Sequence, residues 1–177
     1  NTCQCSKHYS VCYCSLKNFI CQCISIYCDY SLIVKMLLCI DDDLYVYKGV
    51  RILGLGGSME YIPDSPNQYT ERKMRARIRR LWWKLWRHKG FDILVTHAPA
   101  YKLNDMEDLP HRGFKAFLDL MDKYHPKYFL HGHVHANYGK GFKRKDVYGT
   151  TRVINGYEFY VIEYPGEPVE AVKPETK

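Results

Sequence analysis

The chain has 177 residues, a formal net charge of +7, and 46% hydrophobic, 15% aromatic and 25% charged residues. This composition is typical of a globular chain with a packed core, and it excludes a collagen-like or largely disordered polypeptide. The positive charge suits anionic partners such as phosphoesters or nucleic acid without selecting among them. No stretch reaches the ~18 apolar residues of a membrane-spanning helix, so we expect no membrane partner and a cytoplasmic location.

The first 40 residues differ from the rest of the chain. All eight cysteines lie within residues 1–39, many of them in C-x-C pairs, and residues 1–40 contain no Gly, Pro, Ala, Arg, Glu or Trp. A cysteine-free body argues against a disulfide framework and for a reducing compartment. We interpret residues 1–40 as an unassigned Cys-rich segment that is disordered or unrelated to the rest of the chain. The alternative is a thiolate cluster for a soft metal such as Zn or Cu(I).

Ordinary folded sequence begins at residue 41. Two β-rich runs, Leu44–Tyr47 and Val50–Leu55, flank Lys48-Gly49 and predict a hairpin. The following G-L-G-G-S stretch lacks both the lysine of a P-loop and the third glycine of a dinucleotide-binding fingerprint. It therefore predicts a strand-to-loop transition rather than a phosphate-binding loop.

A single amphipathic helix is predicted next, with Ser65 as its N-cap, Pro66 at its first position and Gly90 after its end. Its apolar positions recur at steps of three and four residues and are Met74, Ile78, Leu81, Trp82, Leu85 and Trp86. Nine of the 26 basic residues fall within residues 72–89. This basic face either covers apolar surface with its side-chain stems or binds an anionic partner, for which nucleic acid is the candidate.

The remaining elements alternate between strand and helix. A strand over Phe91–Thr96 is followed by a helix over Gly113–Tyr124 and a strand over Tyr128–Leu130. Two final strands, at 151–154 and 157–164, flank Asn155-Gly156, a strong hairpin signal. A Pro/Glu/Lys-rich tail over 166–177 is expected to be loose. The chain therefore divides into residues 1–40, a folded α/β body over 41–165, and the tail.

Histidines follow the predicted strands at the points where these end. His97 stands in T-H-A-P, whereas His131, His133 and His135 lie in H-G-H-V-H. Neighbouring parallel strands bring such residues to one edge of a sheet, and neutral imidazoles suit Zn, Fe, Mn, Ni or Co. The sequence therefore predicts a metal site. A metallo-β-lactamase-like site is excluded, because its H-x-H continues into Asp-His whereas Ala136 follows His135 here.

These motifs carry a resemblance to a known family. D-I-L-V-T-H-A-P and Y-F-L-H-G-H-V-H resemble the last two motif blocks of the calcineurin-like metallophosphoesterases, and R-I-L-G-L-G-G-S-M with P-N-Q-Y-T-E resembles a bacterial subgroup. The resemblance covers roughly residues 44–164 and implies the C-terminal half of an αββα sandwich. It also implies two divalent metal ions (Mn, Fe, Zn, Ni or Co) and hydrolysis of a phosphomonoester or phosphodiester by a metal-activated hydroxide.

The resemblance also assigns site residues. It implies that His97 and His133 ligate one metal and His135 the other, with no protein nucleophile and no catalytic residue beyond the ligands. The residues themselves add further candidates: His111 and Arg112, before a helix N-terminus, are either a phosphate-binding pair or a solvated loop tip, and the loop tip is slightly favoured. His131 either supports a ligand or is an ordinary strand-end residue.

The sequence departs from the family in its first half. The D-x-H, G-D-x-x-D and G-N-H-D motifs do not occur in the chain. Without the bridging aspartate that these motifs supply, we expect this chain to bind metal weakly, and whether it is active is left open. An intact parent protein with the same C-terminal half would be the enzyme. A non-catalytic metal-binding protein and a nucleic-acid-binding protein are the alternatives.

Overall fold

A computed structural model describes residues 9–14, 23–27, 37–135, 142–157 and 159–164. Its strands are β1 (Tyr9–Cys14), β2 (Cys23–Tyr27), β3 (Leu37–Cys39), β4 (Asp43–Tyr47), β5 (Val50–Leu55), β6 (Ser58–Met59), β7 (Gln68–Tyr69), β8 (Ile93–Thr96), β9 (Tyr128–His131), β10 (Lys145–Tyr148), β11 (Thr151–Asn155) and β12 (Phe159–Tyr164). Its helices are α1 (Glu71–Arg80), α2 (Trp82–Arg87), α3 (Lys115–Tyr124) and the 3-10 turn η1 (Leu109–His111). None of the described helices has both the length and the apolar character needed to span a bilayer.

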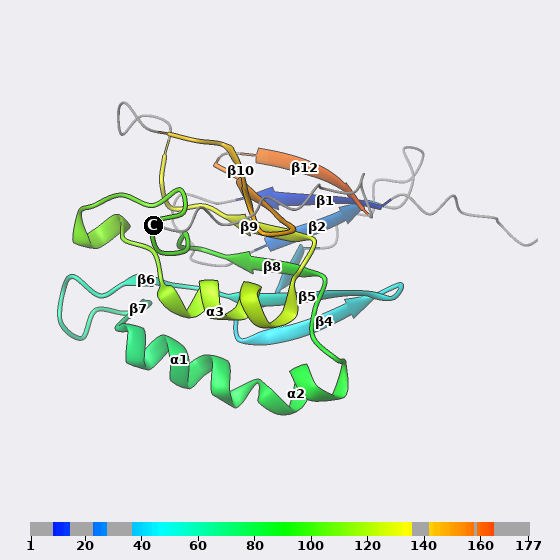
Figure 1. Cartoon of the computed structure of the whole chain (residues 1–177), viewed down its shortest axis with the longest axis horizontal. Coiled ribbons are helices and arrows are strands. Elements are labelled where there is room, and N and C mark those ends of the chain that lie inside the picture. The colour runs from blue at the N-terminus through cyan, green and yellow to red at the C-terminus, as the bar shows by residue number, and fades with distance from the viewer. Residues whose placement is uncertain (1–8, 15–22, 28–36, 136–141, 158, 165–177) are drawn as a thin grey trace, which may run out of the picture.

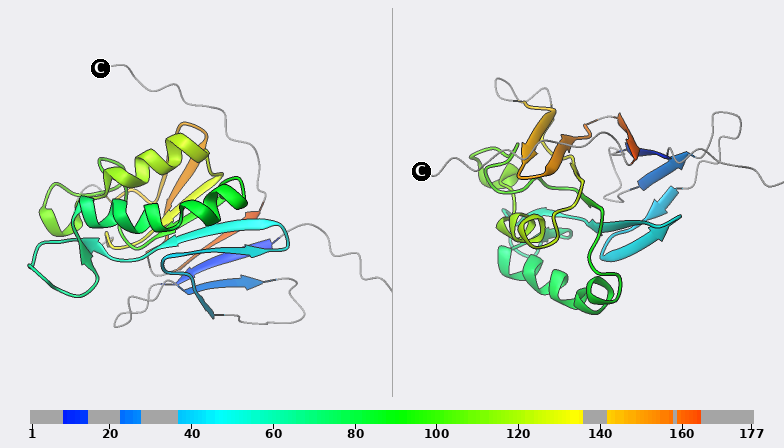
Figure 2. Two further views of the ribbon diagram at one scale, coloured as in Figure 1. Left: turned by 90° about the horizontal axis from the view of Figure 1, so that it is seen from below. Right: turned by 45° about the vertical axis from the view of Figure 1, so that its right-hand side comes forward.

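A six-stranded sheet forms the centre of the molecule, in the order β10-β11-β9-β8-β5-β4. The four inner strands are parallel to one another, and β4 and β10 pair antiparallel at the two edges. Every residue of β8 and of β9 is buried, as expected for parallel strands covered on both faces. The three α-helices lie on one face, and β1, β2 and β12 lie on the other (Figures 1 and 2).

Two apolar cores fill the spaces on either side of this sheet. On the helix side, Met74, Leu85 and Phe117 pack with Leu94 and Phe129 of the sheet. On the other face the apolar cluster includes Ile52, Ile93, Val95, Leu130 and Ile162. The alternation of strand residues between the two clusters follows from the two-residue repeat of a β-strand. The predicted α/β class and the partial sandwich are therefore confirmed.

Strands also occur within residues 1–40. A second sheet has the order β12-β1-β2-β3, and all of its pairs are antiparallel. The sequence of this segment shows no sustained strand periodicity, so it does not predict these strands. The cysteine side chains of the proposed thiolate cluster lie outside the described part of the structure, as do residues 166–177, so the limits of the three segments stay predictions.

The predicted hairpin at Lys48-Gly49 is confirmed. β4 and β5 pair antiparallel from Tyr47 and Val50 onwards. Lys48 and Gly49 both have positive φ, at 46° and 86°, as a two-residue turn matching the strand twist requires.

The basic helix differs from its prediction in where it begins. Thr70, rather than Ser65, caps α1, and its side chain accepts a hydrogen bond from the Lys73 N–H. Leu81 separates α1 from α2. Gly90 does end the helical segment as predicted, with φ of 94° and an N–H that donates to the Leu85 carbonyl at 2.8 Å.

The buried face of this helical segment also differs from its prediction. Leu81 and Leu85 are buried, but Trp82 and Trp86 are 61% and 65% exposed. Arg77, predicted on the basic outer face, is 3% exposed. Apolar periodicity therefore identifies the helix but misplaces its tryptophans.

The predicted hairpin at Asn155-Gly156 is wrong. β11 pairs with β9 and β10, whereas β12 pairs with β1 in the other sheet. The Asn155 side-chain amide donates to the Val134 carbonyl at 2.8 Å, and the Gly156 N–H donates to the His131 carbonyl at 2.7 Å. Asn155 and Gly156 are thus bonded to β9 and the residues after it, and they do not form a hairpin turn between β11 and β12. The actual hairpin joins β10 to β11 at Gly149, whose φ is 58°.

A buried arginine joins α1 to the loop after β5. The guanidinium of Arg77 bonds the carboxylates of Asp41 (2.7 Å) and Asp42 (2.9 Å) and the carbonyl of Gly56 (2.6 Å). It also lies 4.1 Å from the centre of the Tyr69 ring. Burial disfavours its charged form, but the hydrogen bond to Asp42 and the charge of Asp41 outweigh this and raise the pKa of Arg77.

The glycine-rich stretch after β5 is required by close packing. A Cβ on Gly54 would lie 2.1 Å from the Ile40 carbonyl, and one on Gly56 would lie 2.9 Å from the Asp41 carboxylate. The Gly56 N–H donates to that carboxylate at 2.5 Å. This stretch is therefore a strand-to-loop transition, as predicted. Its glycines leave room for the backbone of Ile40 and the side chain of Asp41 to pack against it.

We predict that Arg77→Ala lowers the free energy of unfolding in urea by roughly 2–4 kcal/mol, because it strips two carboxylates and a carbonyl of their shared donor. Arg75→Ala is the matched control. Arg75 pairs with Glu71 and Asp119 on the surface, so its loss costs less than about 1 kcal/mol. Equal costs for the two variants would contradict a structural role for the buried arginine.

Candidate metal centre

The candidate site lies where β8 and β9 end. Their parallel register pairs Val95 with Leu130, so the residues that follow both strands meet at one edge of the sheet. The backbone ladder continues past the strand ends, because the Gly132 N–H donates to the His97 carbonyl at 3.0 Å. The two histidine motifs are thereby tied together by their main chains.

His97 and His133 are in direct contact. His97 Nε2 and His133 Nδ1 lie 3.0 Å apart, and the ring centres are 4.7 Å apart. His133 has a φ of 67°, a left-handed conformation that costs a non-glycine residue roughly 1–2 kcal/mol. Such strain is typical of functional loops, where the surrounding contacts hold the residue in place.

A backbone carbonyl fixes the tautomer of His133. His133 Nε2 lies 2.8 Å from the carbonyl oxygen of Pro110. That oxygen can only accept, so Nε2 carries the proton and Nδ1 presents a lone pair toward His97. A carbonyl behind a liganding imidazole is the usual arrangement in metal sites, because it orients the ring and makes the other nitrogen more basic.

The spacing of the two nitrogens suits joint binding of one ion. In tetrahedral geometry two imidazole nitrogens about 2.1 Å from a divalent ion lie about 3.4 Å apart, whereas neighbouring nitrogens in octahedral geometry lie about 3.0 Å apart. His97 Nε2 and His133 Nδ1 have this separation. The two side chains therefore fit neighbouring positions in a single coordination sphere.

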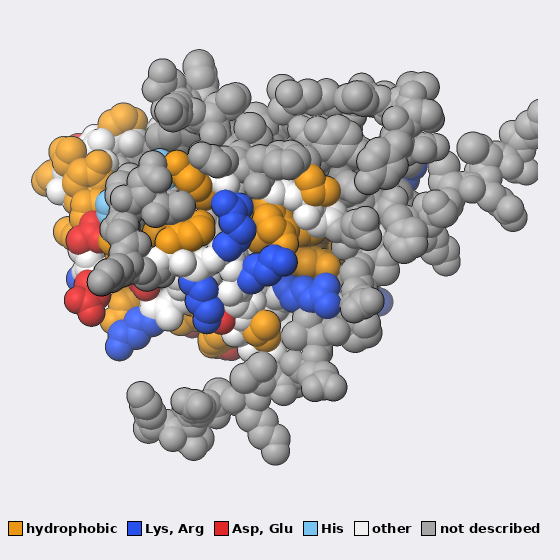
Figure 3. Space-filling model, turned by 90° about the horizontal axis from the view of Figure 1, so that it is seen from above, with side chains coloured by type: hydrophobic (Ala, Val, Ile, Leu, Met, Phe, Trp, Pro, Cys, Tyr) orange, Lys and Arg blue, Asp and Glu red, His pale blue; other side chains and the backbone are white. Residues whose placement is uncertain are grey.

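Burial keeps these imidazoles neutral. Burial, together with smaller effects of the charges of His133 and His135, lowers the pKa of His97 to about 4. The pKa of His133 is also lowered, again chiefly by burial, against an opposing effect of the Pro110 hydrogen bond. Small areas of imidazole surface are visible at one edge of the molecule in Figure 3. Neutral imidazole is the form that binds metal.

His135 affects the pKa of both His97 and His133, but its described ring contact is with another residue. Its ring packs against Tyr157, with 4.6 Å between ring centres. Among the described residues, no group of three or more His, Cys, Asp or Glu side chains is arranged to hold a metal ion. The structure therefore brings together two of the three predicted ligands.

His131 is a fully buried strand residue. Its Nδ1 contacts the Gly132 carbonyl at 3.2 Å, and its ring packs on Phe129. Its Nε2 has no hydrogen-bond partner within the described part of the chain. Burial lowers the pKa of His131 to about 4. His131 thus contacts the backbone of Gly132, the residue that links it to His133.

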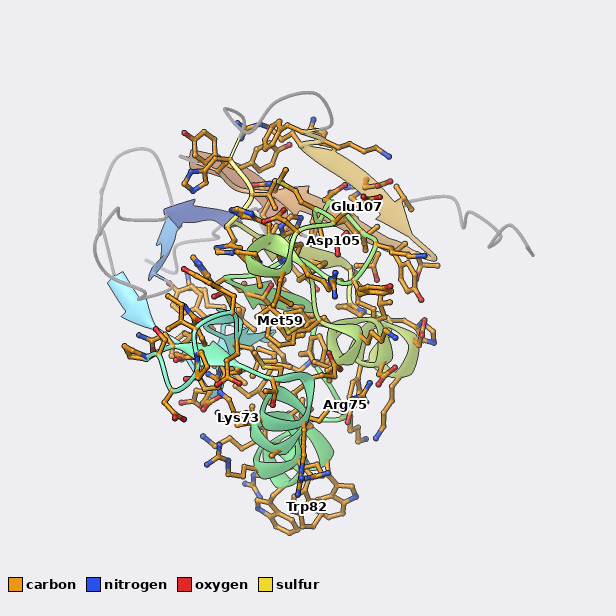
Figure 4. The ribbon with its side chains drawn as sticks, turned by 90° about the vertical axis from the view of Figure 1, so that its left-hand side faces the viewer. Met59, Lys73, Arg75, Trp82, Asp105 and Glu107 are labelled. Carbon is orange, nitrogen blue, oxygen red and sulfur yellow. The ribbon has the colours of Figure 1, made fainter. Side chains whose placement is uncertain are left out.

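The loop between β8 and α3 brings a further histidine to the site. The ring of His111 lies 5.1 Å from that of His133, and its Nδ1 contacts the Asp108 carboxylate at 2.5 Å. Arg112 is exposed and donates to the Glu107 carbonyl. Figure 4 shows Asp105 and Glu107 on this loop. Sequence reasoning missed Asp108 and Pro110, although Asp108 stands one helical turn before His111.

The N-terminus of α3 is already occupied. The Glu71 carboxylate accepts hydrogen bonds from the Lys115 and Ala116 N–H groups at 3.1 and 2.8 Å. A carboxylate in this position satisfies unpaired donors and complements the helix dipole. These two N–H groups are therefore not available to a phosphate. The prediction that the helix N-terminus would bind phosphate together with His111 and Arg112 is wrong for the helix N-terminus.

Comparison with known proteins gives one family match. The model of the family described as calcineurin-like phosphoesterase matches residues 17–137. No curated protein matches the sequence.

Solved structures resemble the chain at low sequence identity. TT1561 of Thermus thermophilus aligns with a TM-score of 0.45 and 18% identity, over 67% of this chain and 49% of that one. A second structure aligns with a TM-score of 0.50 and 18% identity, over 70% and 49%. The chain thus spans about half the length of these two structures, and at this identity the likeness concerns the fold alone.

The buried histidines predict acid sensitivity. The folded chain lowers the pKa of His97 and His131 from 6.5 to about 4, so protons bind more strongly to the unfolded chain. Stability is full above about pH 6.5 and falls as the pH drops toward 4, by up to roughly 3 kcal/mol per histidine. Urea titrations across this range measure the loss.

His131→Phe should remove part of this acid dependence, because a phenyl ring fills the buried site without titrating. His125→Asn is the control, since His125 is exposed at the end of α3 in a left-handed conformation that Asn tolerates. An unchanged acid slope in His131→Phe would rule out His131 as a source of the sensitivity.

Proposed function

The chain belongs to the calcineurin-like phosphoesterase family, and from this premise we propose that its protein hydrolyses phosphomonoesters or phosphodiesters with divalent metal ions. One observation carries the proposal. His97 and His133 present neighbouring nitrogens 3.0 Å apart at the carboxyl ends of adjacent parallel strands. This separation is that of two neighbouring ligands in an octahedral coordination sphere.

We assign the three predicted ligands to two ions. His97 and His133 would hold one ion between Nε2 and Nδ1, and His135 would contribute to the second. Mn, Fe, Zn, Ni and Co all accept imidazole ligands, so the residues do not select one metal. Packing against Tyr157 orients the His135 ring, which supports a positioned rather than a freely rotating side chain.

When bound, a pair of divalent ions supplies Lewis-acid stabilisation of a phosphoryl oxygen and an acidified water. The protein's own residues hold and shield this site. The Pro110 carbonyl keeps the proton of His133 on Nε2, so Nδ1 stays available. Partial burial of His97 lowers its pKa to about 4 and so keeps its ring neutral at physiological pH.

The loop residues supply contacts for the substrate. His111 is held by Asp108 beside the His133 ring, where it would contact a phosphoryl oxygen. Arg112 is exposed nearby and would attract an anionic ester, although it is not positioned by the helix N-terminus. The bridging carboxylate of the family has no counterpart in the chain's motifs, so the full ligand set requires residues beyond these.

A non-catalytic metal-binding role is the second candidate. The His97 and His133 pair alone supports it, because two imidazoles bind an ion without the bridging group that couples a second one. Hydrolysis and binding must therefore be measured separately.

We predict that the chain binds Co²⁺ or Mn²⁺ through this pair, measured by calorimetric titration. His97→Ala and His133→Ala should each weaken binding roughly tenfold or more, because even the loss of an outer-shell partner of a ligand typically costs about tenfold. His125→Asn should bind as the unaltered chain does. Equal metal affinity in the unaltered chain and in all three variants would contradict the assignment of His97 and His133 as ligands.

Hydrolysis of bis-p-nitrophenyl phosphate with added Mn²⁺ tests the chemistry. Activity that disappears in His133→Ala supports phosphoester hydrolysis by this chain. Metal binding that depends on both histidines, without hydrolysis, favours the non-catalytic role.

A further inference from the structure

The outer face of α2 exposes every tryptophan of the protein. The chain contains three tryptophans, and Trp82, Trp83 and Trp86 are 61%, 53% and 65% exposed. Leu81 and Leu85 occupy the inward face of the same turns and are buried. We call these three tryptophans the tryptophan cluster. Large aromatic side chains gathered on a surface usually mark an interaction site.

The rings of the tryptophan cluster pack on one another. Trp83 and Trp86 are stacked with 4.9 Å between centres and 28° between planes, and Trp82 meets Trp83 edge-on at 5.5 Å. In Figure 4, Trp82 projects from the far end of the helix layer, away from the sheet. The cluster is therefore a protruding apolar knob rather than the wall of a groove.

Arginines surround the tryptophan cluster. The helical hydrogen bonds continue through Leu81, whose N–H binds the Ile78 carbonyl and whose carbonyl accepts the Leu85 N–H. Positions three and four apart therefore adjoin, which places Arg79 and Arg80 beside Trp83 on one side and Arg87 on the other. All three arginines are exposed.

These arginines carry uncompensated charge. Lys84 pairs with Asp43, and Arg75 pairs with Glu71 and Asp119. Within the described ranges, by contrast, no ion pair or hydrogen bond involves the guanidinium groups of Arg79, Arg80 or Arg87. The tryptophan cluster thus has positively charged residues at its edge, and their charge would be complemented by an anionic partner.

We propose that the tryptophan cluster and its arginines bind the surface of an anionic phospholipid membrane. Indole rings partition to the boundary between headgroups and acyl chains, where an apolar ring and a polar N–H are both satisfied. Guanidinium groups bind phosphate oxygens of the headgroups and are attracted by the negative surface potential. A short helix with this composition lies in the interface and does not cross the bilayer.

The ring geometry favours lipid over single-stranded nucleic acid. Nucleic-acid platforms offer open aromatic faces on which bases stack, commonly along a charged groove. Here the stacked Trp83 and Trp86 cover part of each other's faces, and the rings protrude. The proposal departs from two expectations drawn from the sequence, because it replaces nucleic acid as the partner of this basic segment and because no membrane partner was expected.

Intrinsic fluorescence tests the proposal directly, because every tryptophan belongs to the cluster. The full chain is titrated with vesicles of equal parts phosphatidylglycerol and phosphatidylcholine. We expect a saturable blue shift of the emission, quenching by brominated phosphatidylcholine, and weaker binding at high salt. Vesicles of phosphatidylcholine alone should give at least tenfold weaker binding, because they lack net negative charge.

Variants assign the binding to the cluster. Arg79→Glu with Arg80→Glu, and Trp82→Ala with Trp83→Ala, should each weaken vesicle binding roughly tenfold or more. Trp86 remains as the reporter in the second variant. The matched control is Lys123→Glu with Lys127→Glu, an equal charge change at exposed positions outside α1 and α2, and it should lose much less affinity. Equal unfolding midpoints show that the variants are folded.

Three results would overturn the proposal. Absence of binding to anionic vesicles is one. Quenching by oligodeoxythymidine without vesicle binding would identify single-stranded nucleic acid as the partner. Emission that is already blue-shifted in buffer, together with dimers in analytical ultracentrifugation that the tryptophan variant abolishes, would identify a second copy of the chain as the occupant. None of these readouts depends on hydrolysis or metal, so they leave the proposed phosphoesterase function untouched.

Discussion

The parallel pairing of β8 with β9 is the interaction on which the rest of the candidate site depends. It brings together His97 and His133, which are 36 residues apart. Backbone bonds from the His97 N–H to the Leu55 carbonyl, and from the Gly156 N–H to the His131 carbonyl, carry the ladder past the strand ends. These bonds tie the residues that follow β8 and β9 to the sheet, and such a scaffold is what a fixed ligand spacing needs.

Holding the histidines in this way works against stability. His133 is in a left-handed conformation, His131 leaves a buried nitrogen unpaired within the described structure, and His97 is half-buried beside another imidazole. Each of these features costs free energy. The buried strands and the Arg77 network offset this cost elsewhere in the fold. Such local conflict with otherwise consistent packing is expected at a functional site.

Several features could be predicted because local chemistry determines them. The Lys48-Gly49 turn and the strand-end histidines follow from turn geometry and from βαβ topology. Asn155-Gly156 failed as a hairpin because a tertiary contact between Asn155 and Val134 overrides the turn preference. Apolar periodicity places Trp82 and Trp86 on the buried face of the helix and Arg77 on the outer face. The structure reverses these positions, because Arg77 is buried by ion pairs that hydrophobicity alone does not reveal. The Pro110 carbonyl behind His133 was unpredictable, because it reaches the site through an irregular loop.

The helical segment that carries the tryptophan cluster is fixed to the same sheet that carries the candidate metal centre. Glu71 at the start of α1 caps α3, and Arg77 joins α1 to the loop after β5. Leu81 and Leu85 belong to the helix-side core, together with Leu94 of β8 and Phe129 of β9. These contacts leave little freedom for α2 to tilt independently of the strands whose ends carry His97 and His133. A surface bound by the tryptophan cluster would therefore set the orientation of the metal centre, and an ester group held in that surface would meet the site from a restricted range of directions.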